Sequence, residues 1–313
     1  MSKARVYRVY GVSVRSDWEL PYCEQAEEAD ALIELTESSS EALRDVASEA
    51  AAMQSAPGWY KVAHLHDGST FLHFPGLFNF HVSADGRQVL ANRLTDSDDE
   101  VFETYLLAFA LSYALLELGI EQLHATCVLI NGSAAGFMGE STHGKSTLAG
   151  AFVGTGYRLI TDDISVLRLR SDGFHVSPGL PRIKLFPEVA QFVLGNRARG
   201  KPMNPHTEKM VIPLKPHQFH REETPLKTLY VLAYPWIRVD ERAVQIRPFS
   251  NQNAFVALCK ASFNSNTSKP ERLKRQFLFA TQVASAVPVK LLSYRNGMDS
   301  LDLVRDAVLS DLA

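Results

Sequence analysis

A glycine-rich turn between an apolar strand and a helix is the feature that most constrains the fold. Residues 136–147 read GFMGESTHGKST and match the pattern G-x-x-x-x-G-K-[ST], with Gly139, Gly144, Lys145 and Ser146 at the fixed positions. Such a turn directs several backbone N–H groups inward, and the following helix adds its positive end. The sequence therefore predicts a phosphate-binding loop, and a purely structural glycine turn is the alternative.

The segments around this turn alternate between strand and helix. Residues 122–130 and 135–139 are typical of apolar strands, residues 145–157 of a helix, and residues 158–170 of a strand, an acidic pair and a second strand. This order predicts an α/β core in which the loop joins a strand to a helix. The residues expected to contact a bound nucleotide are Gly139, Glu140, Ser141, Thr142, His143, Gly144, Lys145, Ser146 and Thr147.

Asp162 and Asp163 come just after the segment RLI, so both carboxylates are expected at a strand end that faces the loop. Two adjacent carboxylates are costly to bury without a counter-charge, and Mg²⁺ supplies one. One carboxylate would hold the metal while the other accepts a proton from an attacking hydroxyl. A solvated pair of acids in a turn is the alternative.

Composition limits the classes of partner. The chain has 313 residues, 46% of them apolar, and a formal net charge of −3, so no overall basic field indicates nucleic acid or an anionic membrane surface. Residues 1–100 hold 8 Lys and Arg against 17 Asp and Glu, a net charge of −9, which leaves 24 against 18, or +6, for residues 101–313. A basic second part fits phosphate chemistry, although ordinary domains also differ in this way.

The cysteines and the apolar runs indicate a cytoplasmic protein. Cys23, Cys127 and Cys259 are odd in number and form no C-x-x-C pair, so neither a disulfide framework nor a zinc site is expected. The first residues lack the apolar run of a secretory signal. The most apolar stretch, residues 105–120, contains Glu117 and is too short to span a bilayer, so it is expected to form a buried helix.

The first hundred residues are typical of a small β-rich module. Strands are expected at 6–14 and 31–37, a short helix at 38–54, and a β-meander at 59–94, where turn dipeptides separate apolar runs. We therefore predict a β-rich accessory domain over residues 1–95.

A connecting helix is predicted over residues 96–120. The acidic run at 95–100 is interpreted as a helix cap, with a metal site as the alternative. The aromatic stripe that follows is interpreted as core rather than as a cofactor site.

The catalytic domain is predicted over residues 121–313. Residues 195–228 lack clear periodicity and are expected to form a long, partly mobile segment. Strands are then expected at 226–234 and 289–294, and helices at 251–263, 272–287 and 300–312.

Three motifs resemble the catalytic core of HPr serine kinase/phosphorylase: GESTHGKSTLA, GYRLITDD, and the upstream pair His124 and Ala125. That family has a P-loop fold related to PEP carboxykinase, and the likeness is specific only over about residues 124–169. A closer likeness is to the HPr-kinase-related enzymes of lasso peptide clusters, which phosphorylate the C-terminal Ser of a precursor peptide. This second likeness depends on four scattered motifs of low specificity: YRVYGVSVRSDWELP, PRIKLFPE, LYVLAY and VPVKLLSY.

The resemblance implies a role for each matching acid and base. Asp162 would be the general base for the substrate hydroxyl, Asp163 and Ser146 would be magnesium ligands, and Lys145 would neutralise the phosphates. His124 would stand beside the acidic pair, whereas a histidine on a strand is otherwise a structural residue.

The resemblance also implies a clamp on phosphate oxygens. Arg182 and Lys184 would form it, with surface cations as the alternative. Lys209 stands where these kinases have a Lys-Arg pair, and its second position here is Met210.

The expected cofactors are ATP, or another nucleoside triphosphate, and Mg²⁺. The expected partner is a precursor peptide, with no nucleic acid and no membrane, and homo-oligomerisation is left open. Three other functions stay open: a kinase of a small molecule or free amino acid, a kinase/phosphorylase of a carrier protein, and a non-enzymatic nucleotide-dependent binding module.

Overall fold

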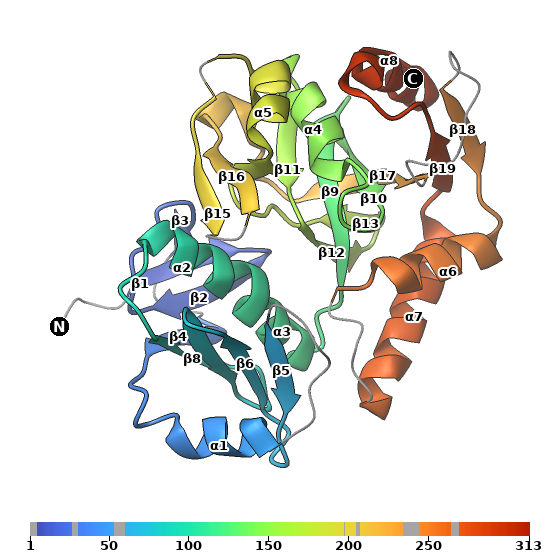
Figure 1. The fold of residues 1–313 in the computed structure, drawn as a ribbon. Helices are drawn as coiled ribbons and strands as arrows, with labels where there is room; N and C mark the ends of the chain where they lie inside the picture. Colours follow the sequence, from blue (N-terminus) through green and yellow to red (C-terminus); the bar gives the residue numbers. More distant parts are fainter. Residues whose placement is uncertain are drawn as a thin grey trace. The chain divides into compact units, whose positions relative to one another are not determined.

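The computed structural model describes residues 5–26, 31–52, 60–196, 198–204, 207–233, 244–263 and 269–313. The chain divides into two compact units, residues 1–120 and residues 121–313, and both mix strands with helices (Figure 1). The helical segment predicted as a connector belongs to the first unit. Among the described residues, no helix combines the length and the apolar character that a membrane span requires.

The first unit is built on one sheet with the strand order β3-β1-β2-β4-β8-β7-β6-β5. The β2–β4 and β4–β8 pairs are parallel, and the other neighbours are antiparallel. The strands are β1 (Arg5–Val9), β2 (Val12–Ser16), β3 (Glu24–Gln25), β4 (Ile33–Glu37), β5 (Lys61–His64), β6 (Thr70–Phe74), β7 (Phe78–Val82) and β8 (Gln88–Arg93).

The predicted meander is confirmed as β5 to β8, but the single strand predicted at 6–14 is wrong. Tyr10 and Gly11 have φ values of 52° and 75°, so they form a tight turn with left-handed dihedrals. Such a turn matches the twist of an antiparallel hairpin, and it folds the segment into β1 and β2.

Helices cover both faces of this sheet. On one face, α2 (Asp99–Tyr105), a π-helical turn (Leu106–Ala110) and α3 (Leu111–Glu117) place rings against β6 and β7, with Phe102 and Phe78 5.4 Å apart between ring centroids. The side chain of Asp98 accepts a hydrogen bond from the Glu100 N–H, which confirms the predicted cap. On the other face, α1 (Arg44–Ala52) lies near Phe71.

The second unit contains a larger and a smaller sheet. The larger has the order β10-β9-β12-β13-β17-β19-β18, with β11 beside β9 and a further parallel pairing of β10 with β17. Its strands are β9 (Gln122–Ile130), β10 (Ser133–Met138), β11 (Arg158–Thr161), β12 (Ile164–Arg170), β13 (Gly173–Val176), β17 (Thr224–Leu232), β18 (Gln245–Pro248) and β19 (Val289–Ser293). The smaller sheet joins β14 (Arg182–Leu185), β16 (Thr207–Pro213) and β15 (Lys201–Asn204) in that order.

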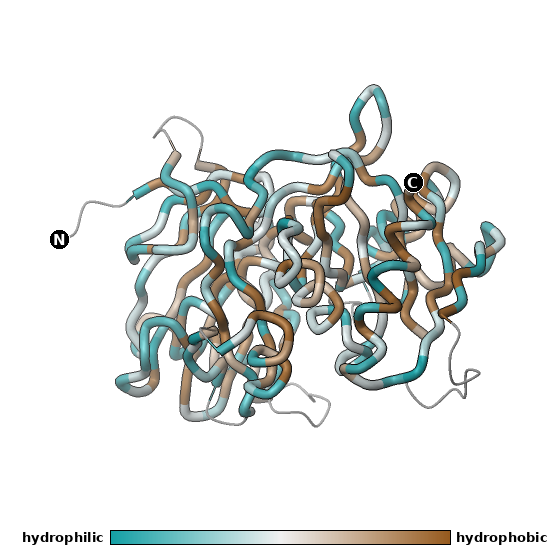
Figure 2. The backbone as a smooth tube through the Cα atoms, turned by 90° about the horizontal axis from the view of Figure 1, so that it is seen from above, coloured by the Kyte–Doolittle hydropathy of each residue, from teal (hydrophilic) through white to brown (hydrophobic). Residues whose placement is uncertain are grey.

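Helices pack on both faces of the larger sheet because its strands are apolar on both sides. Along β10, Phe137 faces α4 (Lys145–Gly154), α5 (Pro187–Leu194) and α8 (Leu301–Leu312), whereas Met138 faces α6 (Asn251–Ala261) and α7 (Pro270–Ala286). Neighbouring residues on a strand point to opposite faces, so each strand contributes side chains to two hydrophobic cores. Figure 2 shows hydrophobic stretches gathered inside each unit and hydrophilic ones along outer loops.

The prediction of a long, partly mobile segment at 195–228 is wrong for the residues that the structure describes there. This segment contains β15, β16, a 3-10 turn (Pro216–Gln218) and the start of β17. Val211 and Ile212 are both buried, and β16 pairs antiparallel with β14 on one side and β15 on the other. Adjacent buried residues leave no period-two alternation, which is why the pattern did not indicate a strand.

Asp311 ties the last helix to the central strands. Its carboxylate accepts hydrogen bonds from the Tyr230 hydroxyl at 2.6 Å and from Lys290 Nζ at 2.7 Å. We expect Asp311→Ala to lower the free energy of unfolding by about 1–3 kcal/mol, because both donors lose their acceptor. Urea unfolding measures the change. Asp306→Ala, on the same helix but with an exposed side chain, is the control and should cost less than about 0.5 kcal/mol; equal losses would contradict the prediction.

Candidate functional site

The glycine loop (residues 139–144) connects β10 to the first turn of α4, as predicted. Gly144 lies directly before the helix with φ 89°, a left-handed conformation that a side chain disfavours, and Thr142 also has a positive φ of 72°. The free N–H groups of the first helical turn and the positive helix end therefore point toward the mouth of the loop. This geometry suits an anion such as a phosphate.

Lys145, the first residue of α4, folds back over the loop. Its Nζ atom donates hydrogen bonds to the carbonyl oxygens of Gly139 at 2.8 Å and Glu140 at 2.9 Å. Burial lowers the pKa of this amine, and the neighbouring Asp163 and Asp162 oppose that shift. The ammonium is thus held between the loop and the acidic pair.

Asp162 is hydrogen-bonded to the first turn of α4. Its Oδ1 atom accepts hydrogen bonds from the hydroxyls of Ser146 and Thr126, each at 2.8 Å, and its Oδ2 atom accepts the backbone N–H of Lys184 at 3.0 Å. The carboxylate that follows β11 therefore meets the hydroxyl that the sequence predicted as a magnesium ligand.

Asp163 has a different set of neighbours. Its Oδ2 atom accepts a hydrogen bond from Lys184 Nζ at 2.7 Å, and its Oδ1 atom lies 3.9 Å from His124 Nε2. The backbone of Asp163 is left-handed, with φ 67°, a conformation that is uncommon for residues other than glycine. The side chain is 20% exposed, so a substrate can reach it.

The electrostatics separate the two acids. Burial, followed by the negative charge of Asp163, raises the pKa of Asp162. Burial alone would also raise the pKa of Asp163, but Lys184, Lys209 and His124 outweigh it and hold that pKa well below its usual range. Asp163 is therefore an anion at neutral pH.

His124 is neutral at physiological pH. Burial and then the positive charge of Lys145 lower its pKa to about 4, against the attraction of Asp163. A neutral imidazole beside a carboxylate can exchange a proton or donate a hydrogen bond, but it adds no charge.

The three cations that the resemblance implies come from the smaller sheet. Arg182 and Lys184 lie on β14 and are two residues apart, so they point to the same side of the strand, and both are buried. Lys209 lies on β16 close enough to act electrostatically on Asp162, Asp163 and His124. Lys184 contacts both acids.

The structure thus gathers most of the predicted site at the end of the glycine loop. One residue that sequence reasoning missed is Thr126. It lies two residues after His124 on β9, and the period-two geometry of a strand would have placed both side chains on one side. Because the hydroxyl of Thr126 carries no charge, nothing at that position in the sequence marked it as a site residue.

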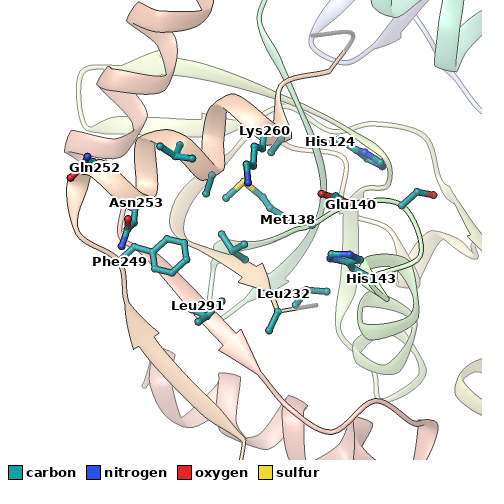
Figure 3. Close-up of a pocket in the computed structure, with 17 residues that line it drawn as sticks. His124, Met138, Glu140, His143, Leu232, Phe249, Gln252, Asn253, Lys260 and Leu291 are labelled. Carbon is teal, nitrogen blue, oxygen red and sulfur yellow. The ribbon is translucent and has the colours of Figure 1, made fainter. Parts of the chain in front are cut away.

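An open pocket of about 550 Å³ adjoins the loop (Figure 3). One wall is formed by Gly139, Glu140 and His124, and the opposite wall is formed by α6. Sequence reasoning did not assign this pocket, because α6 lies more than a hundred residues after the loop and its local pattern indicates only an amphipathic helix.

The donor atoms of the site fit a magnesium nucleotide. Mg²⁺ prefers oxygen ligands and is usually held by one or two carboxylates together with substrate phosphates. Ser146 and Asp162 supply a hydroxyl and a carboxylate, and the loop supplies the anion-binding N–H groups. No cluster of three or more His, Cys, Asp or Glu residues suited to a metal occurs within the described ranges, so a closed all-protein metal cage is not seen there.

No protein-family model matches the sequence, and no curated protein matches it. Among solved structures, the chain is similar to the Hpr(Ser) kinase/phosphatase from Coxiella burnetii, with 14% identity and a TM-score of 0.32 over 61% of this chain and 99% of that one.

Proposed function

We propose that this protein is an ATP- and Mg²⁺-dependent kinase that transfers the γ-phosphate to a serine hydroxyl. The observation that carries the proposal is the convergence of Ser146, Asp162 and Asp163 at the mouth of the glycine loop. Phosphoryl transfer needs positioning and charge neutralisation more than covalent chemistry, and loop, cations and acids supply both.

The contacts favour the reverse of the assignment that the resemblance implies for the two acids. Asp162 contacts Ser146, so these two residues would hold the metal. When bound, Mg²⁺ neutralises charge on the terminal phosphates. Lys145 would bind the β- and γ-phosphate oxygens once its ammonium leaves the loop carbonyls.

Asp163 would then receive the proton of the acceptor. Its carboxylate is ionised at neutral pH, so it can accept a hydrogen bond from the hydroxyl before transfer, and Lys184 and His124 lie beside it. In the step, the acceptor oxygen bonds to the γ-phosphorus, the bond from that phosphorus to the β,γ-bridging oxygen breaks, and the hydroxyl proton passes to Asp163. The products are the phosphorylated acceptor and ADP.

For the acceptor, we propose the C-terminal serine of a lasso precursor peptide. Its support is the sequence resemblance described above, which includes PRIKLFPE, the segment that supplies Lys184. A small molecule, a free amino acid or a carrier protein remains an alternative acceptor for the same chemistry.

Incubation with ATP and Mg²⁺ in the presence of candidate peptides tests the function. We expect the mass of one phosphoryl group on a peptide that ends in Ser, and loss of the product when EDTA removes the metal. Reversal by inorganic phosphate would favour the carrier-protein kinase/phosphorylase. Nucleotide binding without transfer to any peptide, amino acid or carrier protein would contradict the proposal and leave a binding module.

A further inference from the structure

The pocket beside the glycine loop extends the proposed site to one side. Its lining includes Gly139, Glu140 and Ser141 from the loop, and it also includes His124. His124 is the residue whose Nε2 atom lies 3.9 Å from Asp163. One side chain, that of His124, therefore both lines the pocket and adjoins the proposed proton acceptor.

The lining also indicates which end of a bound nucleotide the pocket meets. Ser146 and Thr147, at the start of α4, are the residues placed for the metal and the inner phosphates, and neither lines the pocket. The pocket instead begins at Asp163's neighbour His124, where the terminal phosphate and the attacking hydroxyl would meet. Its position fits the acceptor better than the nucleoside.

The chemistry of the pocket is mostly apolar, with one cation. Met138, the last residue of β10, and Leu291, in the middle of β19, line the pocket from two strands, and Phe249 and Val256 line the other wall, with Val256 46% exposed. Lys260 follows on the same face of α6 and extends over the pocket in Figure 3. No ion pair joins Lys260 to a carboxylate within the described ranges.

We propose that this pocket binds the phosphate acceptor through a large apolar side chain next to the hydroxyl-bearing residue, while Lys260 pairs with a carboxylate of the same acceptor. The substrate class is a short peptide or peptide end with an apolar residue beside a serine and a free carboxylate. This inference rests on the proposed function, because the position of the hydroxyl is taken from it. Apolar walls bind the side chain by excluding water, and the cation supplies charge selectivity.

Three synthetic peptides test the proposal: acetyl-Gly-Leu-Ser with a free carboxylate, the same peptide as its amide, and acetyl-Gly-Asp-Ser with a free carboxylate. Each is assayed as an acceptor with ATP and Mg²⁺, and its Kd is measured without ATP by saturation-transfer NMR. We expect the first to bind at least about tenfold more tightly than the other two, since an apolar contact and a charge pair are each worth about that much.

Two variants locate the binding. Ala257→Phe fills the pocket from α6, and Lys260→Ala removes the cation. Each variant should raise the Kd of the first peptide about tenfold, while the Kd of ATP stays within about twofold of the wild-type value. Lys260→Ala should also abolish the preference for the free acid over the amide. Lys274→Ala, an exposed lysine on α7 that does not line the pocket, is the matched control. Thermal unfolding shows whether each variant is folded.

The outcomes separate the two proposals. Weaker ATP binding in Ala257→Phe with unchanged peptide binding would make the pocket a nucleoside site and overturn the inference. If neither substitution changes phosphoryl transfer to the peptides, the inference about the pocket is overturned while the proposed kinase activity stands. Peptide binding that depends on both residues without any phosphoryl transfer would support the pocket and reject the kinase.

Discussion

Asp163→Asn is expected to lower kcat by a factor of about 10²–10⁴, the usual contribution of a general base, while the Kd of ATP with Mg²⁺ stays nearly unchanged. The amide keeps the shape of the side chain but cannot take the proton of the acceptor. Asp163 contacts Lys184 and lies near His124, and no contact with Ser146 is seen, so its loss should leave the metal position intact. Steady-state kinetics and nucleotide titration give the two quantities.

Asp162→Asn is the matched comparison, because the residue is adjacent and the chemical change is the same. Asp162 accepts the Ser146 hydroxyl, so this variant should raise the Mg²⁺ concentration needed for half-maximal activity by at least about tenfold. If Asp163→Asn raises the Mg²⁺ requirement instead, and Asp162→Asn removes turnover at saturating Mg²⁺, the roles are those that the sequence resemblance implies.

Arg272→Met is expected to lower the free energy of unfolding of the second unit by about 3–5 kcal/mol, the usual cost of removing one partner of a buried ion pair. Arg272 Nη1 lies 2.9 Å from Glu121 Oε2, and the two side chains are only 3% and 5% exposed. Arg272 also donates a hydrogen bond to the carbonyl of Phe263 at 3.2 Å. Chemical unfolding followed by a probe in this unit measures the loss.

Arg275→Met is the control for this prediction. Arg275 reaches the same carboxylate at 3.7 Å but is 36% exposed, so its loss should cost less than about 1 kcal/mol. The double variant Glu121→Gln with Arg272→Met should regain part of the stability, because no buried charge is then left alone. A stability of Arg272→Met equal to the wild type would show that water already solvates Glu121.

The core of the site could be predicted from the sequence because its signals are local. Gly139, Gly144 and Lys145 lie within seven consecutive residues, and the strand and helix beside them have clear periods. Asp162 and Asp163 follow within one strand of the helix. Short sequence separation leaves few ways to arrange these elements, so the convergence at the loop follows from the pattern.

The surroundings of the acids could not be predicted in the same way. In β14, the alternation of Arg182 and Lys184 with apolar residues is typical of a half-exposed strand, yet all four residues are buried. Lys184 is buried because it faces the acids rather than water, and the acids lie about twenty residues earlier in the sequence, so the local pattern of β14 could not indicate it. Nor does either residue type in the acidic pair reveal the left-handed backbone at Asp163.

Lys184 reaches Asp162 through its backbone N–H and Asp163 through its ammonium, so one residue of a small three-stranded sheet aligns two carboxylates at once. A slip of a single position in the β14–β16 pairing would turn that ammonium to the opposite side and remove both attachments together. The register of the β14–β16 pairing thus sets the position of both carboxylates in the reaction centre. Insertion of one residue inside β14 should therefore abolish phosphoryl transfer, even though every group that would contact the phosphate is still present.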